Sequence, residues 1–218
     1  MENSHTPEKD FSEQIITYWM EDCLNDVVSK NVFQFCKLHS MEESQFYAHF
    51  SSLDDLQSKI WVTLFQSALS LLVASENFAK YDEKNKLISL YITLFETFTL
   101  NRSYLIESLP KDLKDFKQLK QLHLLRKELK EFSKSHLYSM NQTIVSEKLS
   151  SITQPIMEEG IWVQFLFILH FWVHDTSPNF EKTDIIIEKS VVTSFDLMNT
   201  KPLESLVDLG KFLWKERM

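Results

Sequence analysis

The chain has 218 residues, 44% of them apolar, and a formal net charge of −8, an ordinary composition for a folded soluble protein. Only two glycines are present, which excludes the Gly-rich loops of Walker-type and dinucleotide-binding proteins. Two cysteines are too few for disulfide bonds to stabilise a fold of this size. The first residues also lack the basic and apolar segments of a secretory signal, so we expect a cytoplasmic protein.

The first part of the chain predicts three short helices followed by a long one. In chain order, the first helix runs from a start signal at 6–10 to a stop at 25–26, and the next three cover 31–38, 42–50 and 53–75. Ser29 is the expected N-cap of the second helix, and Ser52 with Asp55 forms a capping pair at the start of the fourth.

The remainder of the chain also predicts helices, because apolar residues recur there at helical spacing and no strand pattern is left over. The predicted ranges are 84–100, 101–108, 112–138, 146–153, 157–174, 183–198 and 203–218. The sequence therefore predicts an all-α protein with a head at 1–52, a helical body at 53–198 and an amphipathic C-terminal helix at 199–218.

Two neighbouring motifs carry a family resemblance. Residues 46–50, Phe-Tyr-Ala-His-Phe, end the predicted third helix, and residues 52–56, Ser-Leu-Asp-Asp-Leu, open the fourth. This order resembles the TetR/AcrR family of bacterial regulators, whose third helix ends in a Leu-Tyr-x-His-Phe type sequence and whose next helix starts Ser-Lys-Glu-x-Leu. The match covers about residues 12–60. It implies a helix-turn-helix head and a body that binds a ligand and forms a homodimer.

The same resemblance identifies candidate DNA contacts in the head. Gln45 is placed to reach a base edge, and Tyr47 and His49 match positions that touch the DNA backbone in DNA-binding members. The alternative for these residues is structural, with Tyr47 packing in the head and Gln45 and His49 simply exposed. The sequence favours this alternative.

The charge of the head opposes DNA binding. Through residue 60, four lysines face eleven acidic residues, so nearly all of the net negative charge lies there. Glu43 stands where the family usually has a lysine or another polar residue, and Glu42 where a serine is common. Because duplex DNA is bound largely by cations that release its counterions, we expect DNA binding to be weak or lost. A ligand-responsive DNA-binding repressor is the alternative function.

Aromatic and aliphatic residues gather on two predicted body helices, 84–100 and 157–174, and could line an apolar pocket between helices. The pattern alone does not distinguish a pocket from a filled core, but the resemblance implies a pocket that binds a lipid-like or other apolar small molecule. The candidate lining residues are Tyr91, Phe95, Phe98, Trp162, Phe165, Leu166, Leu169 and Trp172.

The last predicted helix is amphipathic, and its apolar stripe includes Leu206, Val207, Leu213 and Trp214. An added helix of this kind is similar to that of the TetR-like lipid-binding proteins of coenzyme Q biosynthesis, which implies peripheral contact with a membrane. The alternative is a helix docked on its own body or on a dimer partner.

Two further patterns contain residue types that can bind ions. His170 and His174 are four residues apart on one helix, so both could face a metal ion, but no third ligand follows at a recognisable spacing. The lysine-rich helix 112–138 is most simply a solvated face, although an anionic head group or an acidic partner could use it. The sequence thus predicts no metal, no cofactor and no enzymatic activity.

Overall fold

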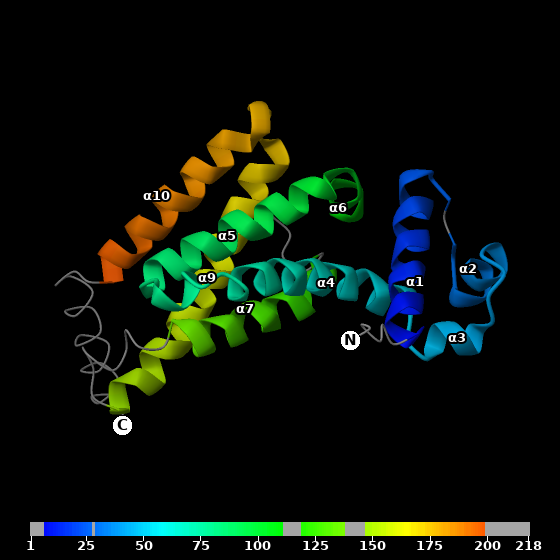
Figure 1. The fold of residues 1–218 in the computed structure, drawn as a ribbon, viewed down its shortest axis with the longest axis horizontal. Coiled ribbons are helices and arrows are strands. Elements are labelled where there is room, and N and C mark those ends of the chain that lie inside the picture. The colour runs from blue at the N-terminus through cyan, green and yellow to red at the C-terminus, as the bar shows by residue number, and fades with distance from the viewer. Residues whose placement is uncertain (1–6, 28, 111–118, 138–146, 199–218) are drawn as a thin grey trace, which may run out of the picture. The chain divides into compact units, whose positions relative to one another are not determined.

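The structure is a computed structural model that describes residues 7–27, 29–110, 119–137 and 147–198 (Figure 1). Within these ranges the regular structure consists of α-helices and short 3₁₀ helices, with no strand, which confirms the all-α prediction. The α-helices are α1 Pro7–Leu24, α2 Val32–Leu38, α3 Glu43–Tyr47, α4 Leu53–Val73, α5 Glu83–Leu100, α6 Arg102–Ser108, α7 His123–His136, α9 Glu147–His174 and α10 Glu181–Met198. The 3₁₀ helices are η1 Phe78–Lys80, η3 Lys120–Leu122 and η4 Pro178–Phe180.

The chain divides into two compact units, one formed by 1–71 with 93–132 and the other by 72–92 with 133–218. Each unit thus combines segments that are distant in sequence. The domain boundaries predicted after residues 52 and 198 stay a prediction.

Local capping explains where the short helices of the head begin. The Asn31 side chain accepts a hydrogen bond from the backbone N–H of Gln34 at 2.9 Å, so Asn31 caps α2, and the prediction that Ser29 does so was wrong. Asparagine accepts as well as serine, and Asn31 directly precedes the first helical residue. At α4, Ser52 Oγ accepts from Asp55 N at 3.1 Å, while the Asp55 carboxylate accepts from Ser51 N at 2.8 Å. The predicted capping pair is therefore present.

The core of the first unit is rich in aromatic rings. Phe35 of α2 and Phe46 of α3 are fully buried and pack edge to face with ring centroids 5.9 Å apart. Trp61 of α4 and Phe98 of α5 pack in the same manner at 5.2 Å. Edge-to-face pairs of this kind stabilise by about 0.5–1.5 kcal/mol beyond the burial of their apolar area.

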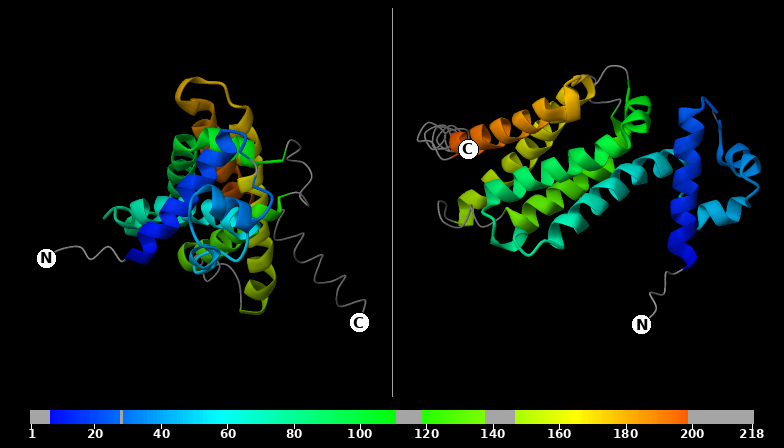
Figure 2. Two further views of the ribbon diagram at one scale, coloured as in Figure 1. Left: turned by 90° about the vertical axis from the view of Figure 1, so that its right-hand side faces the viewer. Right: turned by 45° about the horizontal axis from the view of Figure 1, so that its top comes forward.

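In the second unit, α9 and α10 contact each other and lie side by side (Figures 1 and 2). The predicted interruption between helices 146–153 and 157–174 was wrong, because α9 continues through Pro155 and has 28 residues in all. Proline removes one backbone hydrogen bond from a helix interior. Burial of the later α9 residues, among them Ile168 and Trp172, outweighs that loss.

The lysine-rich segment also differs from its prediction. Instead of one helix over 112–138, the described part has the 3₁₀ turn η3 at Lys120–Leu122, followed by α7 at His123–His136. Residues 111–118 lie outside the described part. Leu122, Leu125 and Leu129 are buried, whereas Lys120 and Lys127 are exposed, so the cationic side of this segment faces solvent.

Candidate functional site

The three predicted DNA contacts all lie on or just after α3, and one of them, Gln45, makes a hydrogen bond at the start of α3. Gln45 is exposed, and its Oε1 accepts a hydrogen bond from the backbone N–H of Glu42 at 2.9 Å at the start of α3. Tyr47 is 52% exposed and packs only its edge on Phe46, so the expectation that it packs in the head was wrong. Tyr47 directly follows Phe46 in the sequence, so the two side chains point to different sides of α3. Only the side that carries Phe46 is buried. His49 is half-buried.

Lys59 of α4, one of the four lysines up to residue 60, makes contacts with neighbouring residues of the protein. Its Nζ donates to the carbonyl oxygen of His49 at 2.8 Å and lies 3.2 Å from the Asp55 carboxylate. The same ammonium lies 5.2 Å from the centre of the Phe50 ring. The Asp55 carboxylate partly offsets the charge of this lysine.

Two acidic residues, Glu42 and Glu43, stand at the start of α3. Glu42 is exposed and Glu43 is half-exposed. Burial, and then the charges of Glu43 and Glu42, raise the pKa of the Cys36 thiol. Burial is the larger cause, and the two glutamates add a smaller contribution of the same sign.

The turn between α2 and α3 is anchored to α1. His39 Nε2 lies 2.8 Å from the carboxylate of Asp22, whose side chain is largely buried. The imidazole also stacks on the Tyr18 ring with centroids 4.3 Å apart. Ser40, the next residue, has a φ of 53°, a left-handed conformation in which glycine is common. The head thus keeps the helix-turn-helix shape although its surface is acidic.

Replacing His39 by alanine should destabilise the protein by about 2 kcal/mol, because the Asp22 carboxylate loses its partner and the stacked ring is lost. Urea-induced unfolding followed by circular dichroism measures the change. His123, an exposed histidine on α7, is the matched control, and its alanine variant should unfold within about 0.5 kcal/mol of the wild type. Equal stability of the His39→Ala protein and the wild type would contradict the anchoring role.

In the body, the eight predicted pocket residues are all buried. Trp162 and Phe165 stack with centroids 5.4 Å apart. The hydroxyl of Tyr91 donates to the carbonyl oxygen of Ile161 at 2.9 Å, and burial raises the pKa of this tyrosine. Burial is equally compatible with a filled core, so the lining of a ligand pocket by these residues stays a prediction.

The predicted membrane residues of the terminal helix, Leu206, Val207, Leu213 and Trp214, lie outside the described residues.

Trp61 is a body residue that the sequence pattern did not single out. It is 0% exposed, and its indole Nε1 has no hydrogen-bond acceptor among the described residues. Buried donors in folded proteins nearly always have an acceptor. No sequence signal could have found it, because the pairing of a donor is visible only in coordinates.

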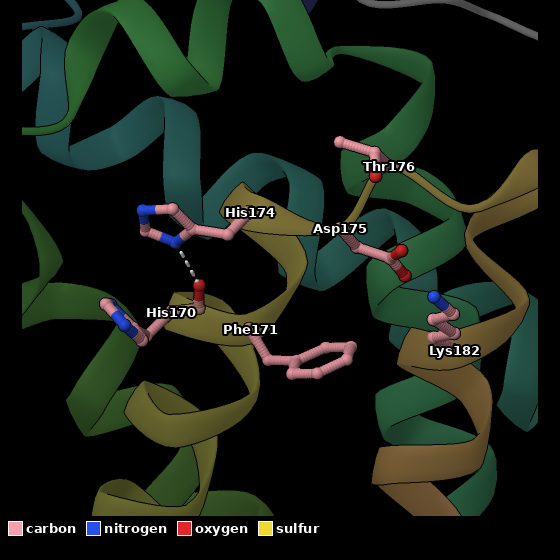
Figure 3. Close-up of a pocket in the computed structure, with 6 residues that line it drawn as sticks. All are labelled: His170, Phe171, His174, Asp175, Thr176 and Lys182. Atoms are coloured by element: carbon pink, nitrogen blue, oxygen red, sulfur yellow. Dashed lines mark hydrogen bonds between the residues drawn. The ribbon is translucent and has the colours of Figure 1, made fainter.

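A cavity of about 350 Å³ lies at the junction of α9 and α10, and none of the predicted pocket residues lines it (Figure 3). Its lining residues are His170, Phe171, His174, Asp175, Thr176 and Lys182. The Asp175 carboxylate, only 5% exposed, accepts hydrogen bonds from the backbone N–H and hydroxyl groups of both Ser177 and Thr183 at 2.7–3.0 Å. Burial alone would raise its pKa, but these hydrogen bonds outweigh burial and lower the pKa to about 2.

Two described helical segments, Leu53–Val73 and Gln154–His174, are long and apolar enough to cross a membrane by length and composition. Core helices of helical proteins pass the same test, and about a third of each segment's residues are buried inside the protein. This is weak evidence for membrane insertion.

An all-α chain with a helix-turn-helix head and a helical body has the architecture of TetR-like regulators. The chain matches the family described as "Tetracyclin repressor-like, C-terminal domain" over residues 86–213, more than half of its length, and it belongs to this family. Among curated proteins none matches it. The family match confirms the TetR resemblance, whereas the resemblance to the lipid-binding proteins of coenzyme Q biosynthesis stays a prediction.

Membership in the family carries general properties. TetR-family domains are generally non-enzymatic regulators that act as homodimers and bind small molecules, and such regulators are generally soluble and cytoplasmic. The matched segment extends to residue 213, so it includes part of the region in which we predict the amphipathic terminal helix.

Proposed function

We propose that this protein is a non-enzymatic TetR-fold homodimer that binds a lipid-like or other apolar small molecule in its body and has lost most of its affinity for DNA. The observation that carries the proposal is the electrostatics of the head. Glu42 and Glu43 stand at the start of α3, while Lys59 is engaged with His49 and Asp55. Anions near phosphates repel DNA instead of releasing its counterions.

The chemistry of the body supports an apolar ligand that carries at least one hydrogen-bond acceptor. Three buried aromatic residues, Trp61 of α4 and Phe95 and Phe98 of α5, offer large apolar surfaces. The unpaired indole N–H of Trp61 supplies a donor for the single polar group of such a ligand. Fatty acids, quinones and similar lipids combine these two properties.

Extraction of the purified protein with organic solvent, followed by mass spectrometry, tests the ligand proposal directly. We expect one class of acceptor-bearing lipid to co-purify in stoichiometric amounts, and a Trp61→Phe variant, which keeps the aromatic ring but lacks the donor, to retain less of it. An unrelated acidic helical protein purified in parallel is the control. Recovery of no more lipid than from this control would contradict the proposal.

Dimerisation is proposed through α9 and α10. On α9, Ile156, Val163 and Phe167 are exposed and recur at spacings of seven and four residues, which places them on one side of the helix. Between them, Gly160 has open space at the position of a Cβ atom. An apolar stripe of this kind is typical of a helix that packs against another protein surface.

A Val163→Glu/Phe167→Glu variant should be monomeric at concentrations at which the wild type is a dimer, because two charges would be buried without partners in the interface. Light scattering coupled to size-exclusion chromatography measures the mass. Leu71 on α4 is 66% exposed and outside the stripe, so Leu71→Glu is the matched control and should leave the dimer intact. An unchanged dimer in the double variant would contradict this interface.

The alternative function is a ligand-responsive transcriptional repressor. One observation favours it: Tyr47 projects from the helix-turn-helix and is 52% exposed, as a residue that touches the DNA backbone must be. In that case ligand binding in the body would change the spacing of the two heads of a dimer and release the DNA.

The proposed peripheral membrane contact depends on the terminal helix. Co-sedimentation of the full-length protein with liposomes of anionic phospholipid, compared with a version ending at Thr200, tests it. We expect weak, reversible partitioning that is lost in the shortened version, because a single amphipathic helix on an acidic protein binds weakly. Equal partitioning of both versions would remove the membrane contact from the account.

A further inference from the structure

Two imidazole side chains form a pair at the C-terminal end of α9. His170 and His174 are both exposed, and their ring centroids are 4.6 Å apart. They border the cavity of about 350 Å³, and both rings lie on the same side of the helix, whereas Asp175 and Lys182 lie on the other side (Figure 3). Residues four apart on a helix face the same way, so one ion can meet both rings.

The orientation of His174 is fixed by a backbone hydrogen bond. Its Nδ1 lies 2.8 Å from the carbonyl oxygen of His170. Because a carbonyl oxygen only accepts, Nδ1 carries the proton in this contact, and the lone pair of the neutral ring is on Nε2. Histidines that bind metals almost always donate their other ring N–H to a carboxylate, a backbone carbonyl or water, and His174 makes the second of these contacts.

We propose that His170 and His174 form a binding site for a divalent transition metal ion such as Ni²⁺, Cu²⁺ or Zn²⁺. Imidazole nitrogen suits these ions, whereas Mg²⁺ and Ca²⁺ require oxygen ligands. His174 is the last residue of α9 and His170 lies one turn before it, near the end of the helix where its dipole favours a cation. The described residues contain no cluster of three or more metal-binding side chains, so two imidazoles chelate the ion and water completes its coordination.

The spacing of the two histidines alone predicted no metal site. The ring separation of 4.6 Å and the hydrogen bond that orients His174 are the observations that favour one. The Asp175 oxygens are occupied by Ser177 and Thr183, so this carboxylate adds negative potential without serving as a ligand.

Isothermal titration of the full-length protein with Ni²⁺ and with Zn²⁺ tests the site. We expect His170→Ala and His174→Ala each to weaken binding by at least about tenfold, since losing even a partner of a ligand has an effect of that size. Added Ni²⁺ should also raise the melting temperature of the wild type more than that of either variant. Mg²⁺ should produce neither effect.

His123 on α7 is the matched control, because its Nδ1 makes a similar contact at 2.8 Å with the carbonyl oxygen of Lys120. No second imidazole follows it at a spacing of four residues. His123→Ala should therefore bind Ni²⁺ as the wild type does. Absence of Ni²⁺ and Zn²⁺ binding to the wild type, unchanged affinity in the His170 and His174 variants, or an equal loss in His123→Ala would each overturn the proposal.

Discussion

Replacing Asp175 with alanine is expected to lower the free energy of unfolding by about 3 kcal/mol, the largest effect on stability that we predict for a single residue. This carboxylate accepts hydrogen bonds from the backbone N–H and hydroxyl groups of Ser177 and Thr183. Thr183 lies in the first turn of α10 and is 1% exposed, so its N–H would be buried without an acceptor. Denaturant unfolding monitored by circular dichroism measures the loss.

The pH dependence of this contribution has a defined sign. The pKa of Asp175 in the folded protein is about 2, below the value of about 3.9 for an aspartate in an unfolded chain. Its stabilising effect is therefore fully present above about pH 4 and is lost as the pH falls toward 2. The difference in stability between the wild type and Asp175→Ala should shrink over that interval. A difference that stays constant from pH 7 to pH 2 would contradict the assigned role of the carboxylate.

The second large effect concerns the head. A Glu42→Ser/Glu43→Lys variant, which restores the residue types usual in the family, should bind random duplex DNA at least about tenfold more tightly than the wild type at low salt. The substitutions remove two anions from the start of α3 and add one cation. The gain should weaken as salt rises, because it depends on counterion release. Fluorescence anisotropy with a labelled duplex measures both quantities.

A control separates a local effect from a change in overall charge. Glu181 and Glu188 are exposed on α10, and a Glu181→Ser/Glu188→Lys variant changes the net charge by the same amount. It should bind DNA as weakly as the wild type. An equal gain in both variants would show that the acidity of the whole chain, and not that of α3, limits DNA binding.

Helical periodicity predicted most of the fold because most helices bury one face. The predicted fourth helix, 53–75, corresponds to α4 at Leu53–Val73, and the predicted last body helix, 183–198, to α10 at Glu181–Met198. The errors arose where a local signal competed with packing. Pro155 indicated a helix end, but burial of the residues that follow it keeps α9 continuous.

Less of the candidate site could be predicted from the sequence. The acidity of the head could be counted directly, but the engagement of Lys59 with His49 and Asp55 required coordinates. The unpaired Trp61 donor and the orientation of His174 are likewise properties of three-dimensional contacts that no spacing rule encodes.

The central claim is that an acidic helix-turn-helix head leaves the apolar body as the functional part of the molecule. Titration of the purified full-length protein with random duplex DNA at low salt tests it most directly. The account predicts no saturable binding in the micromolar range. Clear micromolar binding that weakens steeply with added salt would contradict it and would establish the repressor alternative.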